Sequence, residues 1–336
     1  MLIFEKQVDS FKELLSCSDR VTIIPHKDPD GDAIGSSLAW LNVLRTNGFD
    51  VYVISPNAIP SNLMWMKGYE FVYVFEEENS LASEIIDKTD LLLFLDFNSI
   101  SRVGSLLDIL NNSVIPKVVI DHHPYPEDGI GNILFSEVSV SSTSELCYNI
   151  IENMGYDIDV DVAESLYAGI ITDTGCLSYG SSHQEVYNIV GSLIAKGINK
   201  EKIHREIYKN KNLSNLQLLG HSLYNRLELL QGLPVAFIYL SRKDLFRFDY
   251  QPGDTEDLVN YPLTIKGITI SAFFSERKKD FIKVSFRSEG DIAINEFAKR
   301  YFNGGGHQNA AGGEMYGTME HVTGMFKIWI KEFFDD

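Results

Sequence analysis

Cysteine is scarce in this sequence, and its three copies, Cys17, Cys147 and Cys176, have neither the spacing of a metal-ligand pair nor that of a disulfide framework. A disulfide-stabilised secreted protein is therefore not expected, and a reducing, cytoplasmic setting is. Long apolar runs are missing too, because no window approaches the roughly 20 apolar residues of a membrane span. Residues 1–6 contain no basic region followed by an apolar run, so we expect no signal peptide and no membrane partner.

Positive charge is in short supply. The chain has 29 Lys and Arg against 47 Asp and Glu, which gives a net charge of −18. Proteins that bind long nucleic acids usually present a basic face to the phosphate backbone. The acidic balance therefore argues against a long nucleic acid and favours a short ligand held by local cations. Part of the excess acid is also expected to ligate metal, because a bound divalent ion reverses the local field.

The length of 336 residues and the hydrophobic content of 44% are typical of two folded domains. Near-continuous apolar runs in the first half alternate with helical periodicity, which predicts a parallel sheet covered on both faces. From Leu233 the pattern becomes rich in strands. We therefore predict an α/β fold with a Rossmann-like parallel-sheet domain over 1–190, a helical linker over 191–212 and a smaller α/β domain over 213–336.

The predicted elements follow from these patterns. The strands of the first domain are expected at 21–25, 50–55, 71–75, 90–96 and 115–121. Helices are expected at 33–47, 143–154, 160–171, 185–195, 201–208 and 213–230. The second domain is expected to have strands at 235–240, 269–274 and 281–286, and helices at 292–302 and 320–334.

One loop concentrates polar chemistry. His26-Lys-Asp-Pro-Asp-Gly-Asp32 lies between the first predicted strand and the first predicted helix, so it brings an imidazole and three carboxylates into a tight turn. In open α/β sheets such a corner, at the carboxyl end of a strand, is where ligands bind. Asp32 falls where the N-cap of the helix is expected. By itself the motif is equally compatible with a solvated turn whose acids cap the helix.

Other polar residues end the neighbouring strands. Asp96 follows one apolar run, Asp121-His122-His123 follow the next, and Asp173 ends a helix. Parallel strands bring their carboxyl ends to one edge of the sheet, so these side chains are expected to converge. The candidate metal ligands are His26, Asp30, Asp32, Asp96, His122 and Asp173.

Carboxylates this close together need compensating positive charge. Two divalent cations supply it, and mixed imidazole and carboxylate donors suit Mn²⁺ or a similar first-row ion better than Ca²⁺. A carboxylate that bridges two ions, with a shared hydroxide, is a device for in-line phosphoryl displacement. Asp96 is our candidate for the bridge.

These motifs resemble the four successive motifs of the DHH phosphoesterase superfamily, and Gly304-Gly-Gly-His307-Gln-Asn-Ala-Ala-Gly312 resembles the signature of its C-terminal DHHA1 domain. The resemblance covers nearly the whole chain and is closest to the nanoRNase and pAp-phosphatase group. It implies a cytoplasmic, Mn²⁺-dependent hydrolase of very short oligoribonucleotides and of 3′,5′-bisphosphate nucleotides such as pAp, with an active site in the cleft between the domains. Mg²⁺ and Co²⁺ are alternative metals, and a homodimer is left open.

The resemblance also implies roles for single residues. His26, Asp30 and Asp96 would hold one ion, and the second would take Asp32, Asp96, His122 and Asp173. His123 would face substrate and either steady the phosphoryl group or help to protonate the leaving oxygen, while Asp121 would orient the histidines. Arg102 recurs in the family pattern without an assigned role here.

The glycine triplet suggests an anion clamp. Gly304, Gly305 and Gly306 are each free to adopt left-handed conformations, so their N–H groups are able to converge on a phosphate. His307 adds a donor, and Arg287, at the end of a predicted strand, is the expected bidentate partner of a terminal phosphate. A surface arginine without a ligand is the alternative at this position.

Three alternatives remain at this point. Within the same chemistry, the substrate is a linear dinucleotide left by cyclic-dinucleotide signalling, or polyphosphate. Outside it, the chain is a nucleotide sensor without catalysis, which the complete ligand set disfavours. Residues 275–279, Ser-Glu-Arg-Lys-Lys, resemble the basic substrate motif of DHH pyrophosphatases, but they are most simply a charged hairpin tip.

Overall fold

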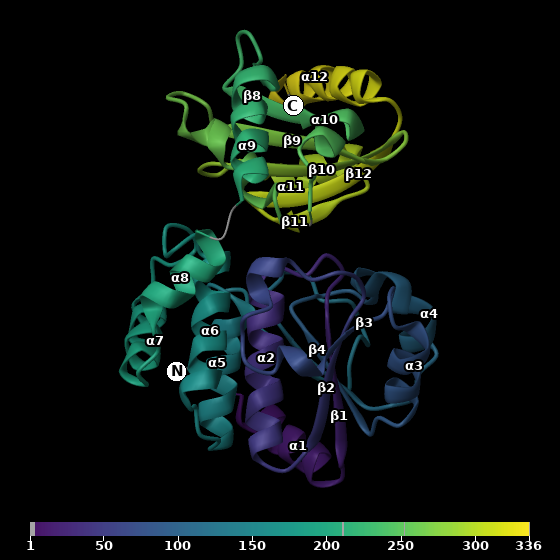
Figure 1. The fold of residues 1–336 in the computed structure, drawn as a ribbon, viewed down its shortest axis with the longest axis vertical. Helices are drawn as coiled ribbons and strands as arrows, with labels where there is room; N and C mark the ends of the chain where they lie inside the picture. Colours follow the sequence, from purple (N-terminus) through teal and green to yellow (C-terminus); the bar gives the residue numbers. More distant parts are fainter. Residues whose placement is uncertain (1–3, 210–211, 252, 336) are drawn as a thin grey trace. The chain divides into compact units, whose positions relative to one another are not determined.

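The computed structural model describes residues 4–209, 212–251 and 253–335. The chain divides into two compact units, Met1–Asn210 and Lys211–Asp336, and each has its own six-stranded sheet (Figure 1). The predicted two-domain α/β fold is confirmed. Among the described residues, no helix is both long enough and apolar enough to span a membrane.

The sheet of the first unit is entirely parallel. Its order is β3-β2-β1-β4-β5-β6. The strands are β1 (Arg20–Pro25), β2 (Asp50–Ser55), β3 (Val72–Val74), β4 (Leu91–Leu95), β5 (Lys117–Asp121) and β6 (Ile133–Ser136). The first five are the predicted strands; β6 is a four-residue edge strand, too short to stand out in the pattern. The order reverses between β1 and β4, the position where doubly wound sheets bind ligands.

Helices cover both faces of this sheet, and 3₁₀ helices η1 (Ser61–Leu63), η2 (Tyr69–Phe71) and η3 (Ile100–Leu106) lie in its loops. One face buries residues of α1, α2, α5 and α6, and the other buries residues of α3, η3 and α4 (Figure 1). The helices are α1 (Glu5–Ser16), α2 (Gly31–Thr46), α3 (Asn79–Asp87), α4 (Leu107–Asn111), α5 (Thr143–Met154), α6 (Val160–Asp173), α7 (Gln184–Ala195) and α8 (Lys200–Tyr208).

Part of the segment expected as a linker belongs to the core of the first unit. Leu193 of α7 and Ile203 of α8 are fully buried there. Residues 210 and 211 of the expected linker lie outside the described residues.

Helices α2 and α6 touch through glycines near the predicted site. A Cβ on Gly35 would lie 2.6 Å from the carbonyl oxygen of Ser165 and 2.8 Å from the amide nitrogen of Gly169. A side chain at Gly35 would therefore force the helices apart. This close packing fixes the start of α2 relative to the end of α6, and each of these ends carries a predicted ligand.

The second unit has a mixed sheet of order β11-β12-β10-β9-β8-β7. Only the β8–β9 pair is parallel. Its strands are β7 (Leu227–Leu229), β8 (Val235–Leu240), β9 (Ile270–Lys278), β10 (Phe281–Ser288), β11 (Gly305–His307) and β12 (Ala310–Tyr316). Its helices are α9 (Leu213–Asn225), α10 (Arg242–Arg247), η4 (Glu256–Val259), η5 (Tyr261–Thr264), α11 (Ile294–Tyr301) and α12 (Met319–Asp335).

The two faces of this sheet are covered differently. One face packs against α11 and α12 around aromatic rings, including Phe274, Phe286 and Phe326. The other face packs against α9, α10 and the 3₁₀ turns over β8 and β9, where Phe273 is buried. The helix predicted over 213–230 ends at Asn225, because residues 227–229 pair with β8 instead. A hairpin is confirmed between β9 and β10, but residues 275–278 belong to β9, so its tip is confined to residues 279 and 280.

Candidate active site

The polar strand ends converge as the sequence predicts. Strands β1, β4 and β5 are neighbours, so the residues at or after their carboxyl ends, His26, Asp96 and Asp121, lie at one edge of the sheet. His26, Asp96, Asp121 and His122 are all buried, although they are polar or charged. Buried ionisable groups are costly unless they are paired or bind metal, so this cluster is the candidate functional site.

Asp96 lies between two histidines. Its Oδ2 is 3.5 Å from Nε2 of His26, and its Oδ1 is 3.6 Å from Nε2 of His122. Its backbone has φ of +68°, a left-handed conformation that is uncommon outside glycine and that clusters at functional sites. The strand end is therefore shaped to present one carboxylate to two imidazoles.

Two groups of potential metal ligands share this carboxylate. His26, Asp30 and Asp96 form one, Asp32, Asp96 and His122 form the other, and within each group the ligand atoms lie within 4.8 Å of one another. Asp173 adjoins the second group, because its Oδ2 lies 3.6 Å from Nε2 of His122. All six predicted ligands are thus brought together.

The N-cap of α2 differs from the prediction. Asp30, not Asp32, is the cap: its backbone is extended, and its side chain accepts hydrogen bonds from the amides of Asp32 at 3.0 Å and Ala33 at 3.1 Å. The helix therefore begins at Gly31, and Asp32 lies buried in its first turn.

The contacts that α5 makes with two of the predicted ligands were not expected from the sequence. Thr143 and Ser144, at its N-terminus, donate backbone hydrogen bonds of 2.6 and 2.8 Å to the two carboxylate oxygens of Asp32. The hydroxyl of Thr143 donates to Oδ1 of Asp96 at 2.8 Å. The signal was the Ser-x-x-Glu pattern from Ser142 to Glu145, which marks a helix start. It shows where a helix begins, but not what its first turn contacts.

Glu145 of the same helix ties down the segment that follows Asp173. Its buried carboxylate accepts two hydrogen bonds from Ser141, from the amide at 2.8 Å and from the hydroxyl at 2.6 Å. The same carboxylate lies 2.9 Å from Nε2 of His183. Between Asp173 and His183 the exposed Cys176 has φ of +57°. The contact between Glu145 and His183 therefore anchors the end of the loop that begins after Asp173 and contains Cys176.

Hydrogen bonds of the ring nitrogens orient the histidines. Nδ1 of His26 lies 2.8 Å from the carbonyl oxygen of Lys27, so Nδ1 carries the proton and donates it. The lone pair of Nε2 therefore faces Asp96. Nδ1 of His123 lies 2.7 Å from Asp121, whose other oxygen accepts from the amide of His123 at 3.0 Å. Asp121 thus holds His123, as the family resemblance implies.

The electrostatics of the cluster call for added positive charge. Burial, with the nearby carboxylates of Asp32 and Asp30, raises the pKa of Asp96 well above its usual range. Burial lowers the pKa of His122, but the carboxylates of Asp173, Asp96 and Asp32 outweigh it and raise this pKa to about 9. Without metal, Asp96 and His122 therefore tend to hold protons. A donor set of two imidazoles and four carboxylates with this need for positive charge fits two divalent cations.

Arg102 contributes charge from outside the ligand set. It is exposed on η3, and its backbone carbonyl accepts a hydrogen bond of 2.7 Å from the amide of Lys27. Burial and then the charges of His122 and Arg102 lower the pKa of His123 well below its usual range. His123 is accordingly neutral near pH 7.

In the second unit, two of the predicted clamp residues share a face. Arg287 of β10 is opposite Ala310 of β12, which in turn is opposite His307 of β11. Directly opposite residues of antiparallel strands project to the same side, so Arg287 and His307 lie two strands apart, about 10 Å at the usual strand spacing.

The glycine triplet differs from the predicted loop. Gly305 and Gly306 are in β11, and of the three glycines only Gly306 has positive φ, at +139°. A Cβ on Gly304 would overlap the carbonyl oxygen of Gly312, and one on Gly306 would overlap that of Ala310. These two glycines allow close strand pairing, whereas Gly305 faces open space. The backbone of Gly305 and Gly306 pairs with β12. The prediction that three left-handed glycines converge their N–H groups on an anion is therefore wrong.

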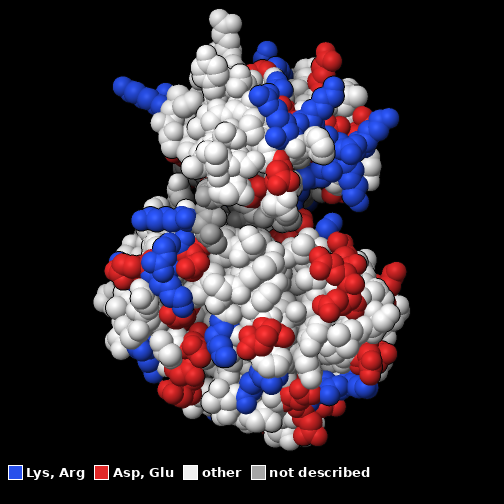
Figure 2. Space-filling view, in the orientation of Figure 1, with Lys and Arg blue, Asp and Glu red and all other residues white. Residues whose placement is uncertain are grey.

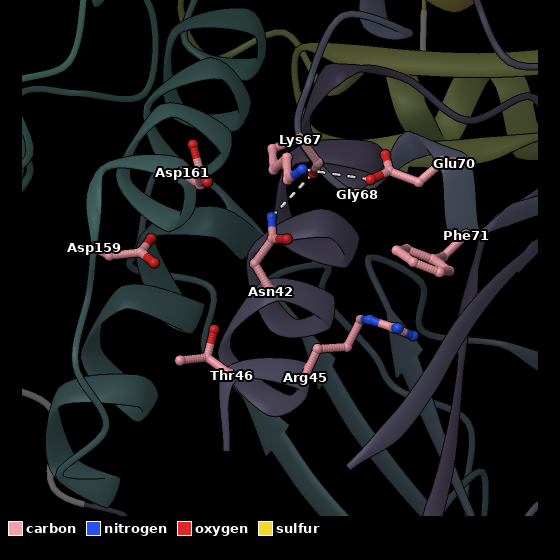
Figure 3. Close-up of a pocket in the computed structure, with 9 residues that line it drawn as sticks. All are labelled: Asn42, Arg45, Thr46, Lys67, Gly68, Glu70, Phe71, Asp159 and Asp161. Carbon is pink, nitrogen blue, oxygen red and sulfur yellow. Dashed lines mark hydrogen bonds and ion pairs between the residues drawn. The ribbon is translucent and has the colours of Figure 1, made fainter. Parts of the chain in front are cut away.

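Two cavities of the structure lie on other surfaces. The larger, about 410 Å³, is lined by Asn42, Arg45, Lys67, Phe71 and Asp161 among others (Figure 3). The Arg45 guanidinium stacks 3.6 Å from the ring centroid of Phe71 and donates to the carbonyl of Val51 at 3.0 Å. These contacts account for the Arg45 side chain as part of the fold.

Comparison with known families agrees with the sequence motifs. Residues 20–170 match the DHH family, N-terminal domain, and residues 232–332 match the DHHA1 domain. A crystal structure of an exopolyphosphatase-related protein from Bacteroides fragilis is 40% identical, with a TM-score of 0.92, and the match covers 99% of this chain and 97% of that one.

Curated relatives are more distant in sequence. The bifunctional oligoribonuclease and PAP phosphatase NrnA of Bacillus subtilis is 28% identical over 90% of this chain and 91% of its own length. The cyclic-di-AMP phosphodiesterase GdpP of the same organism is 26% identical over 97% of this chain, but over only 50% of its own length. The chain therefore belongs to the DHH family, carries a C-terminal DHHA1 domain, and is a hydrolase of phosphoester bonds.

Proposed function

We propose that this hydrolase acts on very short oligoribonucleotides and on 3′,5′-bisphosphate nucleotides such as pAp. The observation that carries the proposal is the position of Asp96, whose two oxygens face different histidines and belong to two ligand groups. A shared carboxylate of this kind suits a two-metal phosphoesterase. Similarity to an oligoribonuclease and PAP phosphatase along most of both chains favours these substrates.

The proposed cofactors are two divalent ions, with Mn²⁺ preferred because imidazoles are among the donors. His26, Asp30 and Asp96 would hold one ion, and Asp32, Asp96, His122 and Asp173 the other. When bound, such a pair activates water and neutralises charge on the phosphoryl group. Thr143 and Ser144 would keep Asp32 and Asp96 in place for this binding.

The remaining residues handle the proton and the phosphate. Hydrolysis joins a water oxygen to phosphorus and releases a sugar oxygen, which must gain a proton. Because Asp121 holds the proton of the neutral His123 ring on Nδ1, Nε2 presents a lone pair. His123 would therefore take up at Nε2 the proton that the attacking water releases, and then pass it to the leaving oxygen. Arg287 and His307 would bind a terminal phosphate from one face of the second sheet. A cytoplasmic location and a homodimer stay predictions of the sequence.

A second candidate has a specific observation in its favour. The 40% identity to an exopolyphosphatase-related protein makes polyphosphate a competing substrate. Hydrolysis of linear dinucleotides is a related alternative, favoured by the similarity to a cyclic-dinucleotide phosphodiesterase.

A hydrolysis screen tests the proposal. The full chain is assayed with Mn²⁺ or Mg²⁺ against pAp, pGpG, a five-nucleotide RNA, pyrophosphate and polyphosphate, with Asp96→Asn as the control for contaminating activity. We expect pAp and the short RNA to have the highest kcat/KM, and Mn²⁺ to exceed Mg²⁺. Preference for polyphosphate or for pGpG alone would replace the proposal by the corresponding alternative.

A further inference from the structure

The charge of the chain is divided unequally between its units. Residues 1–210 contain 14 Lys and Arg against 31 Asp and Glu, whereas residues 211–336 contain 15 against 16. In the second unit, lysines and arginines gather on one side of the surface (Figure 2). The net charge of −18 therefore comes almost entirely from the first unit. It does not exclude a local basic surface on the second unit.

Strand β10 exposes a regular row of side chains. Its residues alternate between the aromatic core and the opposite face, which carries the half-buried Phe281, Lys283, Ser285 and Arg287. Their partners on β12 are, in the same order, Tyr316, Glu314, Gly312 and Ala310. The face formed by these eight residues, the β10–β12 face, therefore has two cations on β10, one aromatic ring on each strand, and an acid and two small residues on β12.

The end of this face opposite Arg287 is an aromatic platform. The rings of Phe281 and Tyr316 lie 5.1 Å apart between centroids at an angle of 58°. Tyr316 is 76% exposed, so most of its side chain is open to solvent. Lys278, the last residue of β9, pairs with Phe281, and Lys279 and Asp280 form the turn beside it; all three residues are exposed. An exposed aromatic ring beside lysines is the combination that holds single-stranded nucleic acid.

We propose that the β10–β12 face binds the nucleotides of the substrate that lie beyond the clamped phosphate. Arg287 would hold the terminal phosphate, Lys283 an internal phosphate, and Tyr316 with Phe281 would stack a base. The inference rests on the proposed function, and it adds a second point of attachment about 20 Å away along the strand. A single strand rises about 3.4 Å per nucleotide when stacked and more when extended, so this row accommodates roughly three to six nucleotides.

The charges on this face limit it to short strands. Glu314 lies directly opposite Lys283, and Asp280 lies in the turn, so two acids oppose the cations. A strand that extends past the platform gains no further row of cations from these two strands. The β10–β12 face thus favours oligonucleotides of a few residues without favouring long RNA.

The test is binding of labelled RNA to the full chain by fluorescence anisotropy, with a chelator present so that no hydrolysis occurs. Tyr316→Ala should weaken binding of a five-nucleotide RNA about tenfold, as expected for loss of one base-stacking contact. It should change the affinity for pAp less than twofold, because pAp does not reach the platform. Glu314→Gln should tighten the five-nucleotide RNA about threefold, since it removes a like charge.

Tyr224→Ala is the matched control, because Tyr224 is a 90% exposed tyrosine on α9 of the same unit. Equal losses for Tyr316→Ala and Tyr224→Ala would overturn the inference, as would equal losses for pAp and the longer RNA. A changed oligomeric state with unchanged RNA affinity would assign the face to a second copy of the chain, and would also overturn it. If the wild type binds neither pAp nor RNA, the proposed function itself fails.

Discussion

The two units build their sites in opposite ways. In the first unit, ionisable side chains are buried at a sheet edge in an acidic domain, and hydrogen bonds from α5 hold two of them. In the second, cations and aromatic rings stand on a half-exposed sheet face in a nearly neutral domain. Burial strengthens electrostatic interactions and suits metal chemistry, whereas exposure suits a ligand that arrives and leaves at each turnover.

This difference predicts which kinetic parameter a mutation in each unit should change. Changes in the first unit should alter metal binding and kcat, and changes in the second should alter KM. The predictions below test that separation, and they run from the largest expected effect on catalysis to the smallest.

Removal of metal should have the largest effect. Exhaustive chelation is expected to lower kcat/KM for pAp at least about a thousandfold, because the ions supply several kcal/mol of transition-state stabilisation. Added Mn²⁺ should restore the rate. RNA binding by the second unit, measured by anisotropy, should change little. Full hydrolysis after chelation would contradict the metal site.

Thr143→Val should come next. It removes the hydroxyl that donates to Asp96 while the backbone bond to Asp32 remains. Loss of an outer hydrogen bond of this kind typically costs about 10- to 100-fold in metal affinity or activity. Titration calorimetry with Mn²⁺ checks it, and Thr143→Ser, which retains the hydroxyl, should bind nearly as the wild type does. Equal affinities for the valine and serine variants would show that the hydroxyl is not needed.

Arg287→Ala tests the expectation that changes in the second unit alter KM. Loss of a charge-assisted hydrogen bond to phosphate should raise KM for pAp about tenfold and leave kcat within about threefold. Bound metal should be unchanged. Arg247→Ala, at an exposed arginine of α10, is the control and should match the wild type. A fall in kcat with constant KM would contradict the expectation that the second unit contributes to substrate binding alone.

Asp244→Asn should affect stability but scarcely catalysis. Asp244 accepts hydrogen bonds from Arg226 at 2.9 and 3.1 Å and from Ser241, at the start of α10. Burial would raise the pKa of Asp244, but these donors lower it to about 2. The stabilisation is therefore present above pH 4 and is lost as the pH falls from about 4 to about 2. Thermal melts at pH 7 should show a loss of about 2 kcal/mol.

The sequence predicted what depends on local pattern. Continuous apolar runs located β1, β2, β4 and β5. The polar residues after β1, β4 and β5, with Asp173 at the end of α6, are the six that converge on the candidate metal site. It missed β11 and β12 because glycine-rich segments favour loops until a neighbouring strand pairs with them. It also missed the bond from Thr143 to Asp32, since these residues are 111 positions apart and only the packed fold joins them.

The most direct test of the central claim is the metal content of the chain. After equilibrium dialysis against Mn²⁺, elemental analysis of the wild type should give two ions per chain, and Asp96→Ala should lose both, because this carboxylate belongs to both ligand groups. Thermal melts of the metal-free proteins would show that the variant is folded. Two ions retained by folded Asp96→Ala, or at most one ion in the wild type, would contradict the account.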